Sequence, residues 1–316
     1  MTASYRAARE RAAFLALPER ALLVVSGPDR QKFLNSMLSN EIAKLQPGQG
    51  CLAALMDVKG HLAALMRVLV TKDSVHLELP KERLAPVQAT LLYYKVAAPV
   101  RFAAPEVAVF GLIGPQASTV LAKAFGELPG LAPEAHVATA IAGQDVLVAR
   151  ASDLPLAGFV LHVDPQAAAE VESALLAAGA VPLARHDLDA LRIEQGLPWY
   201  GPDVDESHLL HETGLVSRYH SSSKGCYLGQ EVIARLEARG GNVNRALRGL
   251  QLGALCASGA MVSVDGQAVG HVTSAAESPR LGPIALAYVH RNHFAPGTRV
   301  EVEGHPAEVV ALPFAE

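Results

Sequence analysis

The chain has 316 residues, a formal net charge of −4, 50% hydrophobic residues and 18% charged residues. A composition this apolar suits a chain that buries a large core, and it excludes disorder as the main state. The acidic balance leaves no broad basic surface for duplex nucleic acid, and no apolar run reaches the ~18 residues of a membrane span. The N-terminus lacks the apolar core of a secretory leader. We therefore expect a cytoplasmic monomer that contacts neither membrane nor nucleic acid.

A short N-terminal helix is predicted first, and one local pattern then occurs three times. In each copy, an apolar strand is followed by a glycine or aspartate, a proline and a run with helical spacing. The strands are predicted at residues 22–25, 107–113 and 159–163, and the helices at residues 29–38, 116–125 and 166–176. We expect the N-cap and N1 positions of these helices to be filled by Gly27-Pro28, Gly114-Pro115 and Asp164-Pro165.

A different block lies between the first two copies. It is predicted to hold a hairpin that turns at Lys59-Gly60, followed by a strand, a helix and a strand. The predicted ranges are strands at 51–58, 61–70, 75–79 and 95–102 and a helix at 81–92. This block is typical of a small domain inserted into another.

The last section has turn signals every few residues and almost no helical period. Its short apolar runs lie at residues 247–252, 260–264, 268–273, 284–289, 299–302 and 307–312. Such a series predicts a small six-stranded β-barrel. The whole chain is thus predicted to be α+β, with three domains at residues 1–48 with 104–200, 49–103 with 201–244, and 245–316.

The segment SSSKGCYLGQEVIARLEARGG, residues 221–241, is predicted to be a loop followed by a helix over 230–238 that Gly240-Gly241 ends. Cys226 then lies just before a helix N-terminus and close in sequence to Lys224. The positive charges of the helix end and of the ammonium both favour a thiolate.

The chain offers other interpretations of these residues. Cys226 is alternatively a small buried hydrophobic residue, like Cys51 and Cys256, which lie in apolar stretches typical of strands. A catalytic pair of Cys226 with His211 or His220 is a further hypothesis. Metal ligation by Cys226 with nearby histidines is weighed against ordinary polar loop histidines. A single cysteine does not hold an iron–sulfur cluster alone.

The second constellation is LDALRIEQGLPWYGPDVDE, residues 188–206. Asp187 is predicted to cap a helix whose Leu188 and Leu191 face a core, and Gly196 and Pro198 end it.

Glu194 falls in the last turn of that helix, where the dipole disfavours a carboxylate, so it needs a strong partner. A fused amidine heterocycle such as a pterin offers two parallel N–H groups to such a carboxylate. Trp199, the single tryptophan, is a candidate stacking face. The alternative is a salt bridge from Glu194 to Arg192 or Arg235, with Trp199 in the core.

The sequence KGCYLGQE at 224–231 resembles the signature of the folate-binding YgfZ family, bacterial relatives of a mitochondrial iron–sulfur assembly factor. That family is a branch of the superfamily of the glycine cleavage T-protein, a folate-dependent aminomethyltransferase. The resemblance spans nearly the whole chain and includes residues 22–40, MDVKGHL at 56–62, the block at 188–206 and residues 270–289.

The resemblance implies a three-domain T-protein-like ring around a tetrahydrofolate channel, with two α+β domains and a C-terminal barrel. It implies that Glu194 recognises the pterin and that the signature residues Cys226, Lys224 and Gln230 lie near the channel. Cys226 and Lys224 are then the candidates for a chemical role, and Gln230, with Trp199 and Arg235, for further folate contacts. The remaining signature positions are Gly225, Tyr227, Gly229 and Glu231. By charge type, Arg235, Arg239 and Arg245 are candidates for the glutamate tail of folate. No metal site is implied.

The resemblance further implies a role in maintaining iron–sulfur enzymes, including radical-SAM enzymes that modify tRNA, through transient contacts with client or assembly proteins. One departure concerns enzymatic activity. Aminomethyltransferases carry a catalytic aspartate in an asparagine-rich segment, and the corresponding residues 76–92 here contain neither residue type, although Glu78 and Glu82 are present. Three hypotheses follow: a folate-binding accessory protein, a folate-dependent aminomethyltransferase or demethylase, and a binding module with neither property.

Overall fold

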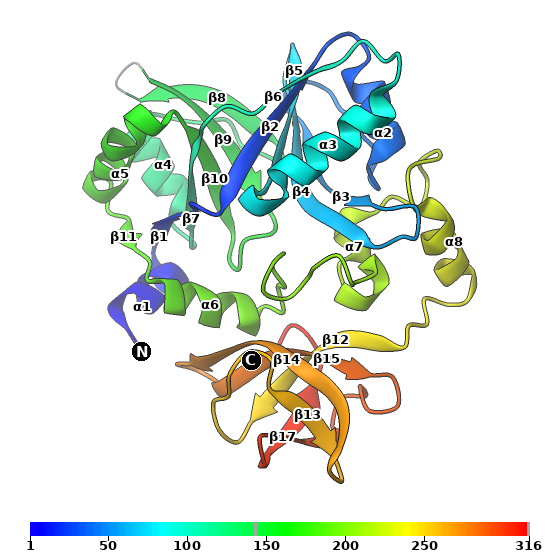
Figure 1. Ribbon diagram of the computed structural model, residues 1–316. Coiled ribbons are helices and arrows are strands. Elements are labelled where there is room, and N and C mark those ends of the chain that lie inside the picture. Colours follow the sequence, from blue (N-terminus) through cyan, green and yellow to red (C-terminus); the bar gives the residue numbers. More distant parts are fainter. Residues whose placement is uncertain (142–143, 315–316) are drawn as a thin grey trace. The chain divides into compact units, whose positions relative to one another are not determined.

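The computed structural model describes residues 1–141 and 144–314, which form two compact units (Figure 1). Residues 7–182 and 217–230 form one unit, which we call the two-sheet unit. Residues 1–6, 183–216 and 231–316 form the other, which we call the barrel unit. The chain starts with α1 (Ala3–Glu10). None of the helices within the described ranges is long and apolar enough to cross a membrane.

The first sheet of the two-sheet unit has five antiparallel strands in the order β3-β4-β5-β2-β6. They are β2 (Arg20–Ser26), β3 (Gly50–Met56), β4 (Leu62–Val70), β5 (Ser74–Pro80) and β6 (Arg101–Ala103). Two helices, α2 (Arg30–Met37) and α3 (Leu84–Lys95), pack on this sheet, and the short η1 (Lys81–Arg83) precedes α3. Apolar side chains of these strands and helices form one continuous core.

The second sheet has six strands in the order β11-β1-β7-β10-β9-β8. They are β1 (Ala13–Ala16), β7 (Ala108–Ile113), β8 (His136–Ile141), β9 (Gln144–Ala151), β10 (Gly158–Val163) and β11 (Val181–Pro182). Helices α4 (Ala117–Phe125) and α5 (Ala168–Ala177) cover it, with η2 (Pro165–Ala167) leading into α5. The sequence pattern does not predict β1, β8, β9 or β11.

The barrel unit contains a closed barrel in the order β12-β15-β14-β13-β16-β17. Its strands are β12 (Arg245–Leu252), β13 (Met261–Val264), β14 (Gln267–Ser278), β15 (Gly282–His290), β16 (Arg299–Val302) and β17 (His305–Val310). Helix α6 (Arg185–Glu194) packs on β14, and η3 (Leu210–Thr213) lies against β12. The predicted six-stranded barrel is confirmed. The segment 217–230 includes most of α7 (Val216–Tyr219) and ends at the first residue of α8 (Gln230–Ala238).

The three predicted strand–helix copies are confirmed as β2 with α2, β7 with α4 and β10 with α5. The predicted cap holds in the third copy, because Asp164 Oδ1 accepts a hydrogen bond from the Gln166 N–H at 2.8 Å and Pro165 begins η2.

In the first two copies the predicted glycine caps are wrong, since Asp29 and Gln116 precede α2 and α4. Gly27 serves a different purpose. Its φ is +110°, and a Cβ there would lie 2.1 Å from the Pro99 oxygen. A close approach of two backbones therefore requires glycine at this position.

Two other expectations change. The strand predicted at 95–102 is only β6, because α3 extends to Lys95 and Val96 adopts a φ of +42° that breaks an extended chain. The predicted domain limits stay a prediction, but strand pairing places β2 between β5 and β6. Residues 20–26 therefore belong to the sheet formed by the inserted block, a long-range pairing that local sequence patterns do not encode.

Candidate functional site

The segment 217–230, which carries the KGCYLGQE motif, is fastened to the end of α2 and to β3. Ser39 Oγ donates to the Tyr219 oxygen at 2.5 Å and accepts from the Ala54 N–H at 2.8 Å. The Ser221 N–H donates to the Ser39 oxygen at 3.1 Å. Ser39 is fully buried, so one serine joins three chain segments.

Lys224 reaches from this segment to the C-terminus of α2. Its Nζ donates to the Asn35 oxygen at 2.5 Å and to the Leu38 oxygen, and it lies 4.5 Å from the ring centre of Tyr227. Burial lowers the pKa of Lys224 to about 8, while Glu41 acts in the opposite direction. The ammonium thus caps a helix end whose carbonyls have no intrahelical partner.

The rest of the motif is also held by the fold. The Leu228 N–H donates to the Ser36 oxygen at 3.1 Å, and the Tyr227 N–H donates to Gln230 Oε1 at 3.2 Å. Gly229 has a φ of +80°, and a Cβ there would lie 2.5 Å from the Asp57 oxygen. The glycine is required because the loop rests directly on the β3–β4 hairpin.

Cys226 is the exposed cysteine of the chain, and it is a free thiol. Cys51 is half-buried on β3, where burial raises the pKa of its thiol to about 12, with Glu134 adding to the shift. Cys256 is half-buried in the loop before β13, not in a strand as predicted, and burial raises its pKa. The alternative that Cys226 is a buried hydrophobic residue is therefore wrong.

The loop histidines divide between the units. The His220 ring lies 5.9 Å from the Tyr227 ring, next to the motif, whereas His208 and His211 belong to the barrel unit. A pair of Cys226 with His220 stays a prediction. Within residues 1–141 and 144–314, no group of three or more histidine, cysteine, aspartate or glutamate side chains is placed to hold a metal ion.

Glu194 lies at the end of α6 in the barrel unit, with its side chain 1% exposed. Tyr5 Oη and Ser278 Oγ each donate to Glu194 Oε1 at 2.6 Å. Arg280 Nη1 lies 3.8 Å from Oε2, an ion-pair separation longer than a hydrogen bond. Two hydroxyl groups therefore orient a carboxylate that stands at the unfavourable end of a helix dipole.

Arg192 does not pair with Glu194. Its Nη1 donates to Asp203 Oδ2 at 2.7 Å, its Nη2 to Ser274 Oγ at 2.8 Å and its Nε to Asp189 Oδ1 at 2.8 Å. The contact with Ser274 fastens α6 to β14 of the barrel. The alternative of a Glu194–Arg192 salt bridge is therefore wrong.

Trp199 is half-buried beside the same helix. The guanidinium carbons of Arg185 and Arg192 lie 4.9 and 5.3 Å from its ring centre, and the main-chain N–H of Trp199 donates to Asp203 Oδ2 at 3.0 Å. Its stacking partners in this structure are thus cationic groups. Asp187 does not cap α6, because Ala184 precedes the helix and Asp187 instead accepts from the Thr2 hydroxyl at 2.7 Å.

Arg235 and Glu231, a candidate folate contact and a position of the KGCYLGQE motif, form an ion pair with each other. Arg235 Nη2 donates to Glu231 Oε1 at 2.7 Å on α8, and both side chains are exposed, at 60% and 81%. The alternative salt bridge from Glu194 to Arg235 does not form. Glu194 belongs to the barrel unit and Cys226 to the two-sheet unit, so the two predicted centres lie on different units of the chain.

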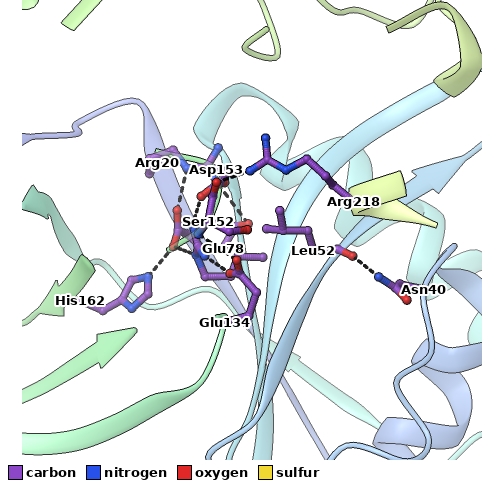
Figure 2. Close-up of polar contacts among 10 residues, drawn as sticks. Arg20, Asn40, Leu52, Glu78, Glu134, Ser152, Asp153, His162 and Arg218 are labelled. Carbon is purple, nitrogen blue, oxygen red and sulfur yellow. Dashed lines mark hydrogen bonds and ion pairs between the residues drawn. The ribbon is translucent and has the colours of Figure 1, made fainter. Parts of the chain in front are cut away.

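A buried ion network, which the sequence analysis missed, joins the two sheets of the two-sheet unit (Figure 2). Arg67 on β4 pairs with Glu78 at 3.2 Å and also with Glu134 and Asp153, which flank β8 and β9. Burial by itself lowers the pKa of Arg67, but Asp153, Glu78 and Glu134 raise it above its ordinary value. Arg67 interrupts an otherwise apolar strand, which is the sequence signal for such a network.

The Glu78 carboxylate contacts three basic side chains, those of Arg20, Arg67 and His162. Arg20 Nε donates to its Oε1 at 2.9 Å and His162 Nε2 lies 2.9 Å from its Oε2 (Figure 2). Burial raises the pKa of Glu78, yet Arg20, Arg67 and His162 hold it well below its usual range. Arg218 donates to the Ser152 oxygen nearby, which ties the start of segment 217–230 to the same corner.

Three histidines lie close to this network. The Nδ1 atoms of His76, His136 and His162 are buried and have no hydrogen-bond partner within the described part of the chain. Burial lowers the pKa of His76 and of His136 to about 4, and the neighbouring histidines add to the effect. The rings of His76 and His136 are therefore neutral in the folded protein near neutral pH.

Comparison with known proteins gives consistent matches. The family model of the GCVT N-terminal domain matches residues 1–220, and that of the glycine cleavage T-protein C-terminal barrel domain matches residues 245–316. An aminomethyltransferase of Streptomyces avermitilis is 32% identical over 98% of this chain and 87% of that protein. The tRNA-modifying protein YgfZ of Klebsiella pneumoniae is 32% identical over 74% of this chain and 69% of that protein.

Among solved structures, the glycine cleavage system aminomethyltransferase T from Bartonella henselae is similar in fold. Its TM-score is 0.89 and its identity 23%, over 99% of this chain and 89% of that one. This likeness confirms the predicted α+β fold with a C-terminal barrel.

Proposed function

The chain belongs to the glycine cleavage T-protein family, and from this premise we propose that it is a tetrahydrofolate-binding accessory protein for iron–sulfur enzymes. In this proposal Cys226 supplies a thiol to client or assembly proteins, among them enzymes that modify tRNA. The likeness to a tRNA-modifying relative over 74% of the chain supports this choice within the family. The protein acts in the cytoplasm as a monomer.

The observation that carries the proposal is that Cys226 is exposed while its neighbours in the KGCYLGQE motif hold the loop in place. Four residues of the motif hold the loop, namely Lys224, Tyr227, Leu228 and Gly229. The Cys226 side chain is exposed to solvent. A thiol that the fold presents but does not use is available to a partner. Because one thiolate does not hold a cluster alone, the contact with a cluster is transient and shared with ligands of the partner.

The donor set around Glu194 fits the pterin edge of a folate. Tyr5 and Ser278 donate to Oε1 from neutral hydroxyls, and Arg280 Nη1 lies 3.8 Å from Oε2. The amidine edge of a pterin pairs with a carboxylate through two parallel N–H groups. When bound, tetrahydrofolate supplies amine nitrogens that carry a one-carbon unit. In this proposal Trp199 and Arg235, which belong to the same unit as Glu194, add contacts to the ligand.

The test uses a strain that lacks this protein. Cys226→Ser should fail to restore the activity of an iron–sulfur enzyme that modifies tRNA, whereas the matched variant Cys256→Ser should restore it. Both proteins should accumulate to the same level, because Cys226 is exposed and serine is close in size. Full restoration by Cys226→Ser would remove the thiol from the proposal.

A second candidate function is a folate-dependent aminomethyltransferase, which relatives of that name favour at 31% and 32% identity over 98% of the chain. The carboxylate chemistry weighs against it. Glu78 is engaged by Arg20, Arg67 and His162 in the interior, and Glu82 is exposed on η1. Glycine-cleavage exchange with purified companion proteins decides the matter, since turnover would favour this candidate.

A further inference from the structure

The barrel unit contains a cavity of about 440 Å³. Its lining includes Arg239, a candidate by charge type for the glutamate tail of folate, but not Glu194, Trp199 or Arg235. It lies where the end of α8 meets the loop that enters β12 and the residue that follows β15. Its volume falls in the range of about 300–1,000 Å³ that small-molecule sites occupy. Two arginines, Arg239 and Arg291, and two asparagines, Asn242 and Asn244, line it beside apolar side chains such as Leu236.

The first arginine is held at the end of a helix. The Gly241 N–H donates to the Leu236 oxygen at 2.8 Å and the Gly240 N–H donates to the Glu237 oxygen at 2.9 Å. Gly240 adopts a φ of +76°, so the two glycines end α8 in a Schellman motif. Asn242 Nδ2 donates to the Arg239 oxygen at 2.9 Å, which fixes the main chain at the cavity edge.

The second arginine is held by the barrel. Arg291 follows β15, and its N–H donates to the Asn244 oxygen at 2.8 Å, which continues the antiparallel ladder of β12 and β15. The two arginines are therefore carried by separate, ordered elements, and both line one cavity.

The cavity is lined by two arginines and one glutamate, Glu212. Within residues 1–141 and 144–314, neither guanidinium group has a hydrogen bond or an ion pair with another side chain. The carboxylate among the lining residues, Glu212, is already engaged by Arg245 Nε at 3.2 Å and by the Leu209 N–H at 3.2 Å. Two arginines thus line one cavity in a chain whose net charge is −4.

We propose that this cavity binds an oxyanion, a phosphate or a carboxylate group of a small organic ligand, between Arg239 and Arg291. The planar fork of a guanidinium group matches such anions with two parallel hydrogen bonds. The carboxamides of Asn242 and Asn244 supply neutral donors, and Leu236 offers an apolar wall to the body of the ligand. Glu194 is not among the residues that line this cavity.

The test is titration calorimetry of the full chain at low ionic strength with two probes, pyrophosphate and γ-glutamylglutamate. One-to-one binding of either probe is expected, and the stronger of the two identifies phosphate or carboxylate as the natural group. Arg239→Gln and Arg291→Gln should each weaken that binding by about tenfold or more. Added salt should weaken it further, because the partners are charged and partly exposed.

Arg299→Gln, which changes an exposed arginine on β16, is the matched control and should bind as the wild-type protein does. Glu194→Gln should also leave probe binding unchanged, so failure of the folate proposal and failure of this one are distinguishable. Absence of binding by both probes, or unchanged affinity in Arg239→Gln and Arg291→Gln with an unaltered melting temperature, would overturn the proposal.

Discussion

The Lys224 ammonium donates to the main-chain oxygen of Asn35 at 2.5 Å, across 189 residues of sequence. The same ammonium donates to the oxygen of Leu38, the C-cap of α2. A lysine two positions before Cys226 thus satisfies the carbonyl groups of a distant helix end, where a positive charge also complements the helix dipole. Its place in the motif is explained by loop anchoring.

Lys224→Met is expected to destabilise the folded protein. The substitution removes two charge-assisted hydrogen bonds and should lower the free energy of unfolding in urea by about 1.5–3 kcal/mol. Lys59→Met, at the exposed tip of the β3–β4 hairpin, is the control and should change it by less than about 0.5 kcal/mol. Unchanged stability together with slower reaction of Cys226 with a disulfide reagent would instead favour a direct effect of Lys224 on the thiol.

Gly229→Ala and Gly225→Ala are a matched pair within one motif. At Gly229 the φ is +80° and a new Cβ would lie 2.5 Å from the Asp57 oxygen, so we expect a loss of about 1–3 kcal/mol in unfolding free energy. At Gly225 nothing lies within 4 Å of the added atom, and the effect should stay within about 0.5 kcal/mol. Equal stability of the two variants would refute the close contact between the loop and the hairpin.

Glu194→Gln tests the folate proposal directly. Loss of one charged partner of an amidine edge should weaken tetrahydrofolate binding by about tenfold or more in titration calorimetry. The control is Glu308→Gln, an exposed position on β17 of the same unit, which should bind normally. If Glu194→Gln folds and binds tetrahydrofolate as tightly as the wild-type protein, the pterin contact is wrong.

The buried histidines predict a loss of stability in acid. Burial lowers the pKa of His76 and His136 from 6.5 to about 4 in the folded state. Between these values the unfolded chain binds protons that the folded chain does not, so stability falls as the pH decreases. The slope is at most about 1.4 kcal/mol per pH unit for each histidine.

Urea unfolding between pH 6.5 and pH 4 measures this slope. His136→Asn should make it shallower by up to one proton, whereas His305→Asn, at an exposed position, should leave it unchanged. The same slope in wild-type and His136→Asn protein would show that His136 does not titrate with folding.

Local patterns were sufficient for much of the fold. Apolar runs between turn signals predicted all six barrel strands, and strand–proline–helix copies predicted β2 with α2, β7 with α4 and β10 with α5. Where the structure differs, the cause is a distant contact. Gly27 was expected to cap a helix, but its role is set by the Pro99 backbone, more than seventy residues away in the chain.

The sequence by itself determined which residues of the motif carry chemical groups, and it singled out Cys226 from the three cysteines. Only the tertiary structure decided what the neighbours do. Lys224 caps α2, Glu194 is oriented by Tyr5 and Ser278, and both relationships join positions more than 80 residues apart. Hydrogen bonds act over about 3 Å in space whatever the separation along the chain, so one sequence shows which groups are present, and folding decides which of them meet.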